Sequence, residues 1–195
     1  MAGNRTDSAI SRRSHPTEYT LRKANLDDCP NIEKLIGLSA RELSAQDYTP
    51  EQIEGALQGA FGVDTQLVED RTYFVAEANG VLVGCGGWSK RKTLFGGDHR
   101  ESRDATELDS RSEAAKIRAF FVHPQWARKG IGRAILALCE SDALSHGFHS
   151  LELMATLPGV RLYTACGFVA AQPIQLKLPS GDSIEFVPMK KTLAI

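Results

Sequence analysis

A short basic segment two-thirds of the way along the chain has the residue types of an anion-binding loop. Residues 127–133 read ARKGIGR; they follow an apolar run over 115–122 and precede an amphipathic stretch. Gly130 and Gly132 carry no side chain to keep an anion away from the backbone, and the amides of a helix N-terminus attract negative charge. Arg128, Lys129 and Arg133 add positive charge at the same place. The spacing therefore predicts a phosphate site where a helix begins near Gly130.

Two other glycine-loop patterns do not fit this segment. A P-loop requires GxxxxGK followed by Ser or Thr, whereas Lys129 here precedes Gly130 and no hydroxyl residue follows. A dinucleotide fingerprint requires GxGxxG after the first strand, but Ile135 stands at its third glycine position. For this segment alone, an ordinary helix that starts after a basic turn remains an alternative.

A second segment strengthens the prediction. Residues 150–168 indicate a short apolar strand, a proline-glycine turn, a helix of one or two turns that carries Tyr163, and a final Gly167-Phe168. The two segments, in this order and at this spacing, resemble the cofactor-binding blocks of the GNAT superfamily of acyl-CoA N-acyltransferases. The resemblance covers roughly residues 115 to 170, and the pair of segments is more specific than either one alone.

The resemblance implies an α/β (α+β) fold with a mixed, mostly antiparallel central sheet flanked by helices. It also implies acetyl-CoA as co-substrate, with no metal ion, and direct attack of an amine on the thioester. In the family, the tyrosine that matches Tyr163 faces the coenzyme A sulfur and protonates the departing thiolate, which would make Tyr163 catalytic. The implied cofactor-binding residues are Phe120 and Val122 on the pantetheine arm and acetyl carbonyl, and Arg128, Lys129, Gly130, Ile131, Gly132 and Arg133 on the pyrophosphate.

Some positions depart from the family pattern. Ala127 stands where many members carry Arg or Gln, and Thr156 replaces an asparagine between the strand and the tyrosine helix. Lys116 occupies the strand position at which some relatives carry a glutamate base. Tyr163 itself could be a packing residue, although its ordinary pKa of about 10, above about 8.5 for a thiol, suits a hydrogen-bond donor.

The general base is consequently not identified from the sequence. The titratable residues near the predicted strands are Glu77, Glu113, Glu152, His99 and His123. Each of these is more often structural than catalytic, and ordered water could carry the proton instead. Cys166 has no His-Asp arrangement beside it in the sequence and is interpreted as a buried thiol.

The remaining segments would position these residues. Apolar alternation predicts strands over 19–24, 72–78, 81–88 and 115–122, with Asn79-Gly80 as a two-residue hairpin turn, and a last hairpin of 169–178 with 183–193. Helices are predicted from 32 to about 45 and again after Thr49, which is followed by a proline at the first helical position. The long polar stretch 89–113 predicts either a functional loop or a disordered one.

Composition restricts the class of protein. The 195 residues include 23 basic and 24 acidic ones, which gives no field that favours nucleic acid or an anionic membrane. The N-terminal segment lacks the apolar core of a signal peptide, and no apolar run is long enough for a membrane helix. Four scattered cysteines without a CxxC pair indicate reduced thiols in a cytoplasmic protein. Residues 1–17 are predicted to be a flexible tail, and residues 18–195 a single GNAT-like domain.

Together these observations predict an N-acetyltransferase that moves an acetyl group from acetyl-CoA to a primary amine on a small molecule, with a homodimer as a possible assembly. A non-catalytic module that senses acetyl-CoA is an alternative, because it would keep the phosphate loop without needing Tyr163. A plain interaction domain would bind no coenzyme A at all. The acceptor is not determined by the sequence; Tyr48, Trp88 and Phe95 are the positions expected to line its site, beside the 89–113 loop.

Overall fold

The computed structural model describes residues 18–100 and 103–193, and its sheet is built around the predicted hairpin. Strands β2 (Tyr73–Ala78) and β3 (Val81–Ser89) are antiparallel neighbours. Asn79 and Gly80 have φ values of 51° and 75°, the positive pair that a two-residue turn of this kind requires. The hairpin is therefore confirmed. The predicted tail over 1–17 lies outside the described residues.

The sheet is mixed and mostly antiparallel, as predicted. Its remaining strands are β1 (Thr20–Lys23), β4 (Ala115–Val122), β5 (Ser150–Thr156), β6 (Val169–Ala170), β7 (Ile174–Lys177) and β8 (Ser183–Thr192). Within the described residues the order is β1-β2-β3-β4-β5-β8-β6, and β7 also pairs with β8. The β4–β5 pair is parallel, whereas the neighbouring pairs are antiparallel.

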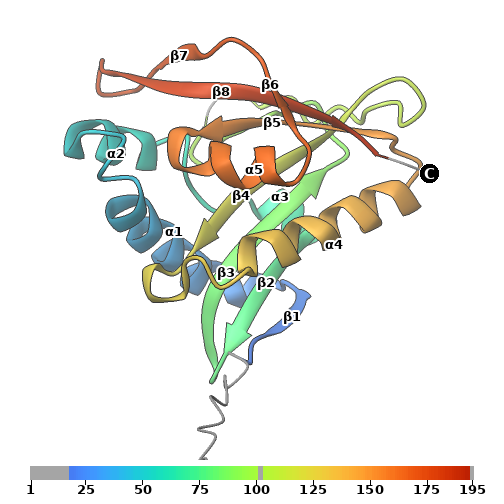
Figure 1. Ribbon diagram of the computed structural model, residues 1–195, viewed down its shortest axis with the longest axis horizontal. Helices are drawn as coiled ribbons and strands as arrows, with labels where there is room; N and C mark the ends of the chain where they lie inside the picture. The colour runs from blue at the N-terminus through green and yellow to red at the C-terminus, as the bar shows by residue number, and fades with distance from the viewer. Residues whose placement is uncertain (1–17, 101–102, 194–195) are drawn as a thin grey trace, which may run out of the picture.

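Strands β4 and β5 are paired only where they begin. Their register contains Ala115 with Leu151 and Lys116 with Glu152, and no pair beyond these among the described residues. Figure 1 shows the two strands separating toward their ends, with the short helix α5 beside the opening. A backbone edge without a strand partner must find other hydrogen-bond partners. The opening between β4 and β5 is therefore where the sheet can receive a ligand.

Helices cover both faces of the sheet. They are α1 (Cys29–Leu43), α2 (Pro50–Leu57), α3 (Thr65–Glu69), α4 (Ile131–Ser145) and α5 (Val160–Ala165), with short 3-10 turns at Leu26–Asp28, Pro124–Trp126 and Leu157–Gly159. Alternate residues of β2 belong to different cores: Phe74 packs on the α4 side, and Tyr73 and Val75 pack with α1 and α2. This alternation is the period of a strand buried on both sides.

The local signals for helix α2 are confirmed. The Thr49 hydroxyl accepts from the Gln52 amide, the Gln52 side chain accepts from the Thr49 amide, and Pro50 occupies the first helical position. This capping box satisfies two amides that would otherwise lack partners. Helix α3 was not predicted, because five residues give too short a stretch for a helical period to be recognised.

The predicted last hairpin is wrong in part. Its second strand is β8, but its first strand is broken into β6 and β7, which flank residues 171–173. Pro173 has no amide hydrogen and cannot donate to the ladder there. Residues 90–113, as far as they are described, form a loop without helix or strand, fastened by an isolated bridge between Arg91 and Glu107. No helix in the described part of the chain is long and apolar enough to cross a membrane.

Candidate active site

The loop before α4 has the backbone conformation of an anion-binding site. Arg128 and Gly130 have φ values of 66° and 86°, and amide groups flanking such left-handed residues commonly form nests for anions. The first hydrogen bond of α4 runs from the Ala134 amide to the Gly130 carbonyl, at 2.9 Å. The amides of the first turn therefore have no acceptor within the helix. This geometry fits the predicted pyrophosphate site.

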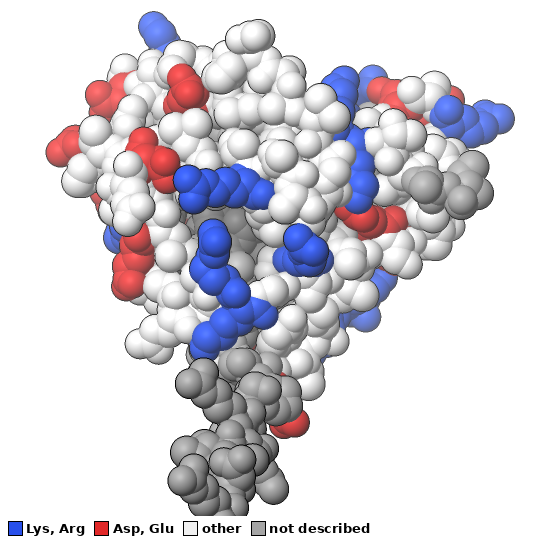
Figure 2. Space-filling view, in the orientation of Figure 1, with Lys and Arg blue, Asp and Glu red and all other residues white. Residues whose placement is uncertain are grey.

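Exposed cations surround this loop. Figure 2 shows Lys and Arg side chains around a hollowed surface near the beginnings of α4 and α5. Among the described residues, the exposed cations of these segments are Arg128, Lys129, Arg133 and Arg161. The Lys129 ammonium also lies 4.6 Å from the centre of the Trp126 ring. Arg161 was missed from the sequence; its place two residues before the predicted tyrosine is the signal that could have indicated it.

The loop, the end of β4 and the tyrosine helix are packed against one another. A Cβ atom added to Gly132 would lie 3.0 Å from a methyl group of Leu162 on α5 and 4.0 Å from one of Val122 on β4. On the neighbouring strand β3, a Cβ on Gly84 would overlap the Ile131 side chain. Small residues at these two places let the first turn of α4 approach the sheet closely.

The two predicted amides of β4 have different environments. Ala119 has a φ of 53° and marks a bulge, so that Phe120 has no register partner on β3. The Tyr73 hydroxyl donates to the Ala119 carbonyl at 2.9 Å and stabilises this bulge. The Val122 amide donates to the Ser39 hydroxyl of α1 at 3.3 Å. A pantetheine carbonyl would have to replace Ser39 at Val122.

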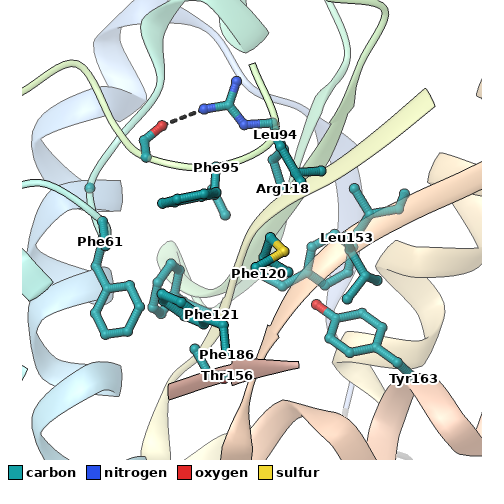
Figure 3. Close-up of a pocket in the computed structure, with 16 residues that line it drawn as sticks. Phe61, Leu94, Phe95, Arg118, Phe120, Phe121, Leu153, Thr156, Tyr163 and Phe186 are labelled. Atoms are coloured by element: carbon teal, nitrogen blue, oxygen red, sulfur yellow. Dashed lines mark hydrogen bonds between the residues drawn. The ribbon is translucent and has the colours of Figure 1, made fainter. Parts of the chain in front are cut away.

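Tyr163 lies at the opening between β4 and β5. Its ring packs edge-on against Phe120, with ring centres 6.1 Å apart, and against Phe168 at 5.7 Å. Figure 3 shows its hydroxyl directed toward the cavity that this residue lines. Burial raises the pKa of Tyr163 well above its ordinary value, because the charged phenolate loses its solvation. The residue therefore stays protonated and can donate a hydrogen bond to a thiolate.

The cavity that Tyr163 lines, here called the inner cavity, is narrow, and most of the side chains around it are apolar. It is lined by residues 60–62, 94–96 and 117–121, with Leu153, Met154, Thr156, Tyr163 and Phe186. Its volume is about 60 Å³, which leaves room for little more than a small functional group. Among the described residues that line it there is no Asp, Glu or His, and Arg118 is the only charged one. The predicted acceptor residue Phe95 is part of this lining.

Arg118 belongs to a buried ion network that sequence reasoning missed. Its guanidinium lies 2.7 Å from the carboxylate of Asp64. It also donates to the Gly96 carbonyl, a bond that Figure 3 shows as a dashed line. Asp64 is fully buried and also pairs with Arg103, which in turn pairs with Asp98 at 2.7 Å. The network joins the 89–113 loop to the central strand. An arginine inside an otherwise apolar strand is the signal that could have revealed it.

The predicted base candidates do not converge on the inner cavity. Glu77 pairs with Arg22, Glu113 accepts from the Asp109 amide, Glu152 pairs with Lys116 and Lys190, and His123 accepts from the Gln125 amide. His99 is exposed and lies outside this cavity. Thr156, at the family's asparagine position, does line it. The described residues of the inner cavity thus offer no side-chain base.

Two of the residues expected at the acceptor site have structural positions instead. Trp88 is fully buried in the α4-side core, and its indole donates to Asp142 at 2.9 Å. The Tyr48 hydroxyl donates to the Glu185 carbonyl and accepts from the Leu157 amide. Burial raises the pKa of Tyr48 to about 12. Both side chains therefore hold elements of the fold together, and neither lines the inner cavity.

The four cysteines and the titratable groups define no second reactive centre in the described ranges. All four cysteines are free; Cys85 and Cys139 are buried, whereas Cys29 and Cys166 are partly exposed. Desolvation raises the pKa of the Cys139 thiol well above its ordinary value and that of Cys85 to about 12. Between residues 18 and 193, as far as the structure describes them, no group of three or more His, Cys, Asp and Glu residues is placed to hold a metal ion.

The fold is similar to those of several solved structures. One is a GCN5-related N-acetyltransferase from Rhodopseudomonas palustris, with 20% identity, 89% of this chain and 95% of that chain covered, and a TM-score of 0.65. Another is YncA from Salmonella typhimurium with its cofactor acetyl-CoA, with 20% identity, 91% of this chain and 95% of that chain covered, and a TM-score of 0.63. A third is the PaiA N-acetyltransferase from Thermoplasma acidophilum in complex with coenzyme A, with 15% identity, 90% of this chain and 99% of that chain covered, and a TM-score of 0.61. At these identities the likeness shows the fold. A search of curated proteins gives no match.

The evidence for the family comes from a match to a protein-family model. The model described as the acetyltransferase (GNAT) family matches residues 37–168, more than half of the chain. The match includes the bulged strand β4, the phosphate loop and the Tyr163 helix. It therefore confirms the resemblance that the two glycine-bearing segments indicated. The chain belongs to the GNAT family of acetyltransferases.

Proposed function

We propose that this protein transfers an acetyl group from acetyl-CoA directly to the primary amine of a small molecule. The observation that carries the proposal is the close packing of Gly132 in the phosphate loop against Leu162 on the tyrosine helix. This contact brings the phosphate loop and the Tyr163 helix to the same opening in the sheet. A coenzyme A whose pyrophosphate lay on the loop could extend its thioester along β4 toward Tyr163.

The chemistry requires no covalent enzyme intermediate. The amine nitrogen would form a bond to the acetyl carbon, and the carbon–sulfur bond would then break with its electron pair going to sulfur. The Phe120 amide, which has no register partner on β3, would stabilise the oxyanion formed between these steps. Tyr163 would donate a hydrogen bond to the leaving thiolate. The products are an N-acetylated amine and free coenzyme A.

Proton removal from the acceptor is the step for which this chain offers no carboxylate or imidazole in the inner cavity. Enclosure in this narrow cavity would remove water from a charged ammonium and so lower the pKa of a bound amine. A larger fraction of the acceptor would then enter as neutral amine. Water would take the proton that nitrogen loses, and a proton would return to the thiolate through the Tyr163 hydroxyl.

The test is the release of free thiol from acetyl-CoA by the full chain in the presence of a panel of primary amines. We expect at least one amine to release thiol faster than a reaction without amine, and mass spectrometry to show its acetylated form. A ligand at 100 times its dissociation constant adds about 2.7 kcal/mol of stability, so coenzyme A should also raise the melting temperature. A thermal shift without amine-dependent thiol release would favour the sensing module; the absence of both would end the proposal.

The proposal extends to the compartment and the assembly. Four free cysteines fit a reducing compartment such as the cytoplasm. Exposed apolar side chains at the sheet edge, Val169 and Ile174, fit an edge that a second copy could cover in a homodimer. Light scattering of the purified protein tests the dimer, and fractionation of the source cells tests the compartment. A near-neutral balance of charges gives nucleic acid and membranes no support as partners.

A further inference from the structure

Strand β4 contains a residue in an unfavourable backbone conformation where it passes the inner cavity. Ala119 has a φ of 53°, a left-handed value that residues with a side chain seldom adopt. Ala119 and Phe120 lie opposite the single residue Gly86 of β3, because the register between the two strands shifts by one residue there. This is a β-bulge, which re-aims the groups of a strand. Its left-handed residue costs free energy that neighbouring groups must offset.

Two buried side chains direct hydrogen-bond donors at the bulge. The Tyr73 hydroxyl of β2 donates to the Ala119 carbonyl at 2.9 Å, and the Cys85 thiol of β3 lies 3.8 Å from the same oxygen. Both side chains are fully buried. Burial raises the pKa of Tyr73 well above its ordinary value, because a phenolate would lose its solvation there. The hydroxyl therefore keeps its proton, and it is the shorter of the two contacts to this carbonyl.

The geometry of a peptide group connects this carbonyl to the next amide. The Ala119 carbonyl and the Phe120 amide belong to one planar peptide group, and no peptide bond in the described residues is cis. In a trans peptide the C=O and N–H bonds point in opposite directions. A hydrogen bond that holds the carbonyl toward Tyr73 therefore directs the Phe120 amide away from Tyr73.

A pair of glycines on β3 makes this arrangement possible. A Cβ atom on Gly87 would lie 2.5 Å from a ring carbon of Tyr73, and one on Gly86 would lie 2.7 Å from the Phe120 ring. Tyr73 belongs to the core beneath α1 and α2, whereas Phe120 packs against the core on the α4 side, where Tyr163 lies. The two rings thus lie against β3 from opposite faces, with the peptide group of the bulge between them.

From this geometry we propose that Tyr73 is a positioning residue for acetyl transfer, whose hydroxyl holds the Ala119 carbonyl and so aims the Phe120 amide at the thioester oxygen. The inference rests on the proposed function, in which that amide stabilises the oxyanion. Tyr73 does not itself line the inner cavity, so it acts only through the bulge. Without the hydroxyl, residue 119 relaxes toward negative φ and the amide turns away. The loss falls on the transition state and not on cofactor affinity.

The first experiment removes only the hydroxyl. Tyr73→Phe should lower kcat about tenfold for the fastest amine of the thiol-release panel, since deleting an oxyanion donor costs about 10²-fold or more and displacing one costs less. The dissociation constant of coenzyme A, measured by calorimetry, should stay the same. Thr72→Val is the matched control, because the buried Thr72 hydroxyl donates to the Leu67 carbonyl at 3.3 Å, away from β4.

Both variants should lower the melting temperature, but only Tyr73→Phe should lower kcat. An unchanged kcat in Tyr73→Phe, or an equal loss of kcat in the two variants, would overturn the inference.

The second experiment tests whether the hydroxyl acts through residue 119. Glycine adopts positive φ about as readily as negative φ, so in the Ala119→Gly background the bulge needs less support. Tyr73→Phe should then cost no more than about threefold in kcat, against about tenfold in the parent protein. A loss of the same size in both backgrounds would contradict the proposal, because the hydroxyl would then act by another route.

A third measurement needs no acceptor amine. Acetyl-CoA labelled with ¹³C at its carbonyl is bound to the full chain, and the carbonyl stretch is recorded by infrared difference spectroscopy. A hydrogen bond from the Phe120 amide polarises this carbonyl, so the band should lie at lower frequency than for free acetyl-CoA. Tyr73→Phe should move it back toward the free value, and Thr72→Val should not. An identical band in the parent protein and Tyr73→Phe would overturn the inference.

The same data separate failure of this inference from failure of the proposed function. If amines are acetylated and both kcat and the carbonyl band ignore the Tyr73 hydroxyl, the acetyltransferase proposal holds and the positioning role is wrong. If the carbonyl band responds to Tyr73→Phe but no amine of the panel is acetylated, the hydroxyl positions the amide of a module that binds acetyl-CoA without transferring its acetyl group, and the proposed function is the part that fails.

Discussion

The phosphate loop takes its amides from one continuous segment, residues 127–133, whereas the inner cavity gathers side chains from positions between Ala60 and Phe186. The loop works through backbone groups at a helix N-terminus, so many side chains could stand there as long as the conformation is kept. The cavity works through aromatic rings and one buried arginine. A side chain lost from the acceptor end should therefore cost more than one lost from the loop.

The largest effect is expected at the acceptor end, for Arg118→Met. This change leaves the fully buried Asp64 with Arg103 as its remaining cation, and loss of one partner from a buried pair costs about 3 to 5 kcal/mol. Urea unfolding measures the loss. The double variant Arg118→Met with Asp64→Asn should recover part of it, because the uncompensated charge is gone. Equal stability of the single and double variants would show that the network contributes no charge pairing.

The second largest effect is expected for Tyr163, which lies between the phosphate loop and the acceptor end. Tyr163→Phe removes the hydroxyl that faces the inner cavity and keeps the ring contacts with Phe120 and Phe168. Since positioned proton donors contribute about 10²-fold or more to turnover, kcat should fall by that order. The dissociation constant of coenzyme A, measured by calorimetry, should not change. An unchanged kcat would mean that Tyr163 is only a packing residue, which its burial also allows.

A smaller effect is expected when the phosphate loop is moved as a unit. Gly84→Ala puts a methyl group into the Ile131 side chain at the start of α4, and overpacking of this kind costs roughly 1 to 3 kcal/mol. The helix start must shift, so the KM for acetyl-CoA should rise while the ratio of kcat/KM values among different amines stays the same. Steady-state kinetics with two acceptors measures both. A changed acceptor preference would mean that the two ends are mechanically coupled.

The difference between the two regions also explains what could be predicted. Asn79-Gly80 and Thr49-Pro50 determine local backbone conformation by themselves, and both features are found as predicted. The phosphate loop and the Tyr163 segment are likewise contiguous patterns, and the family match includes both. Contiguous patterns of this kind can be recognised without knowing which distant segments of the chain come into contact.

The acceptor end could not be predicted from local sequence patterns. The partner of Arg118 is Asp64, and nothing in either local segment points to the other. Trp88 was expected near the acceptor from its position at the end of the predicted strand 81–88, beside the 89–113 loop, but it is buried in the α4-side core. Pro173 breaks the final hairpin in a stretch whose composition otherwise favours strand. Each of these outcomes depends on tertiary packing, which overrides local preference.

The smallest effect should come from a cation of the phosphate loop. Lys129 is exposed and lies over the Trp126 ring, and exposed charges contribute about 1 kcal/mol or less. Lys129→Ala should therefore raise the KM for acetyl-CoA by about two- to fivefold, and added salt should reduce the difference from the parent protein, because salt screens exposed charges. Lys34→Ala, an exposed lysine on α1, is the control for a general change of charge. If Lys129→Ala abolished binding, the loop would depend on its side chains as strongly as the acceptor end does, and the contrast between the two regions would be lost.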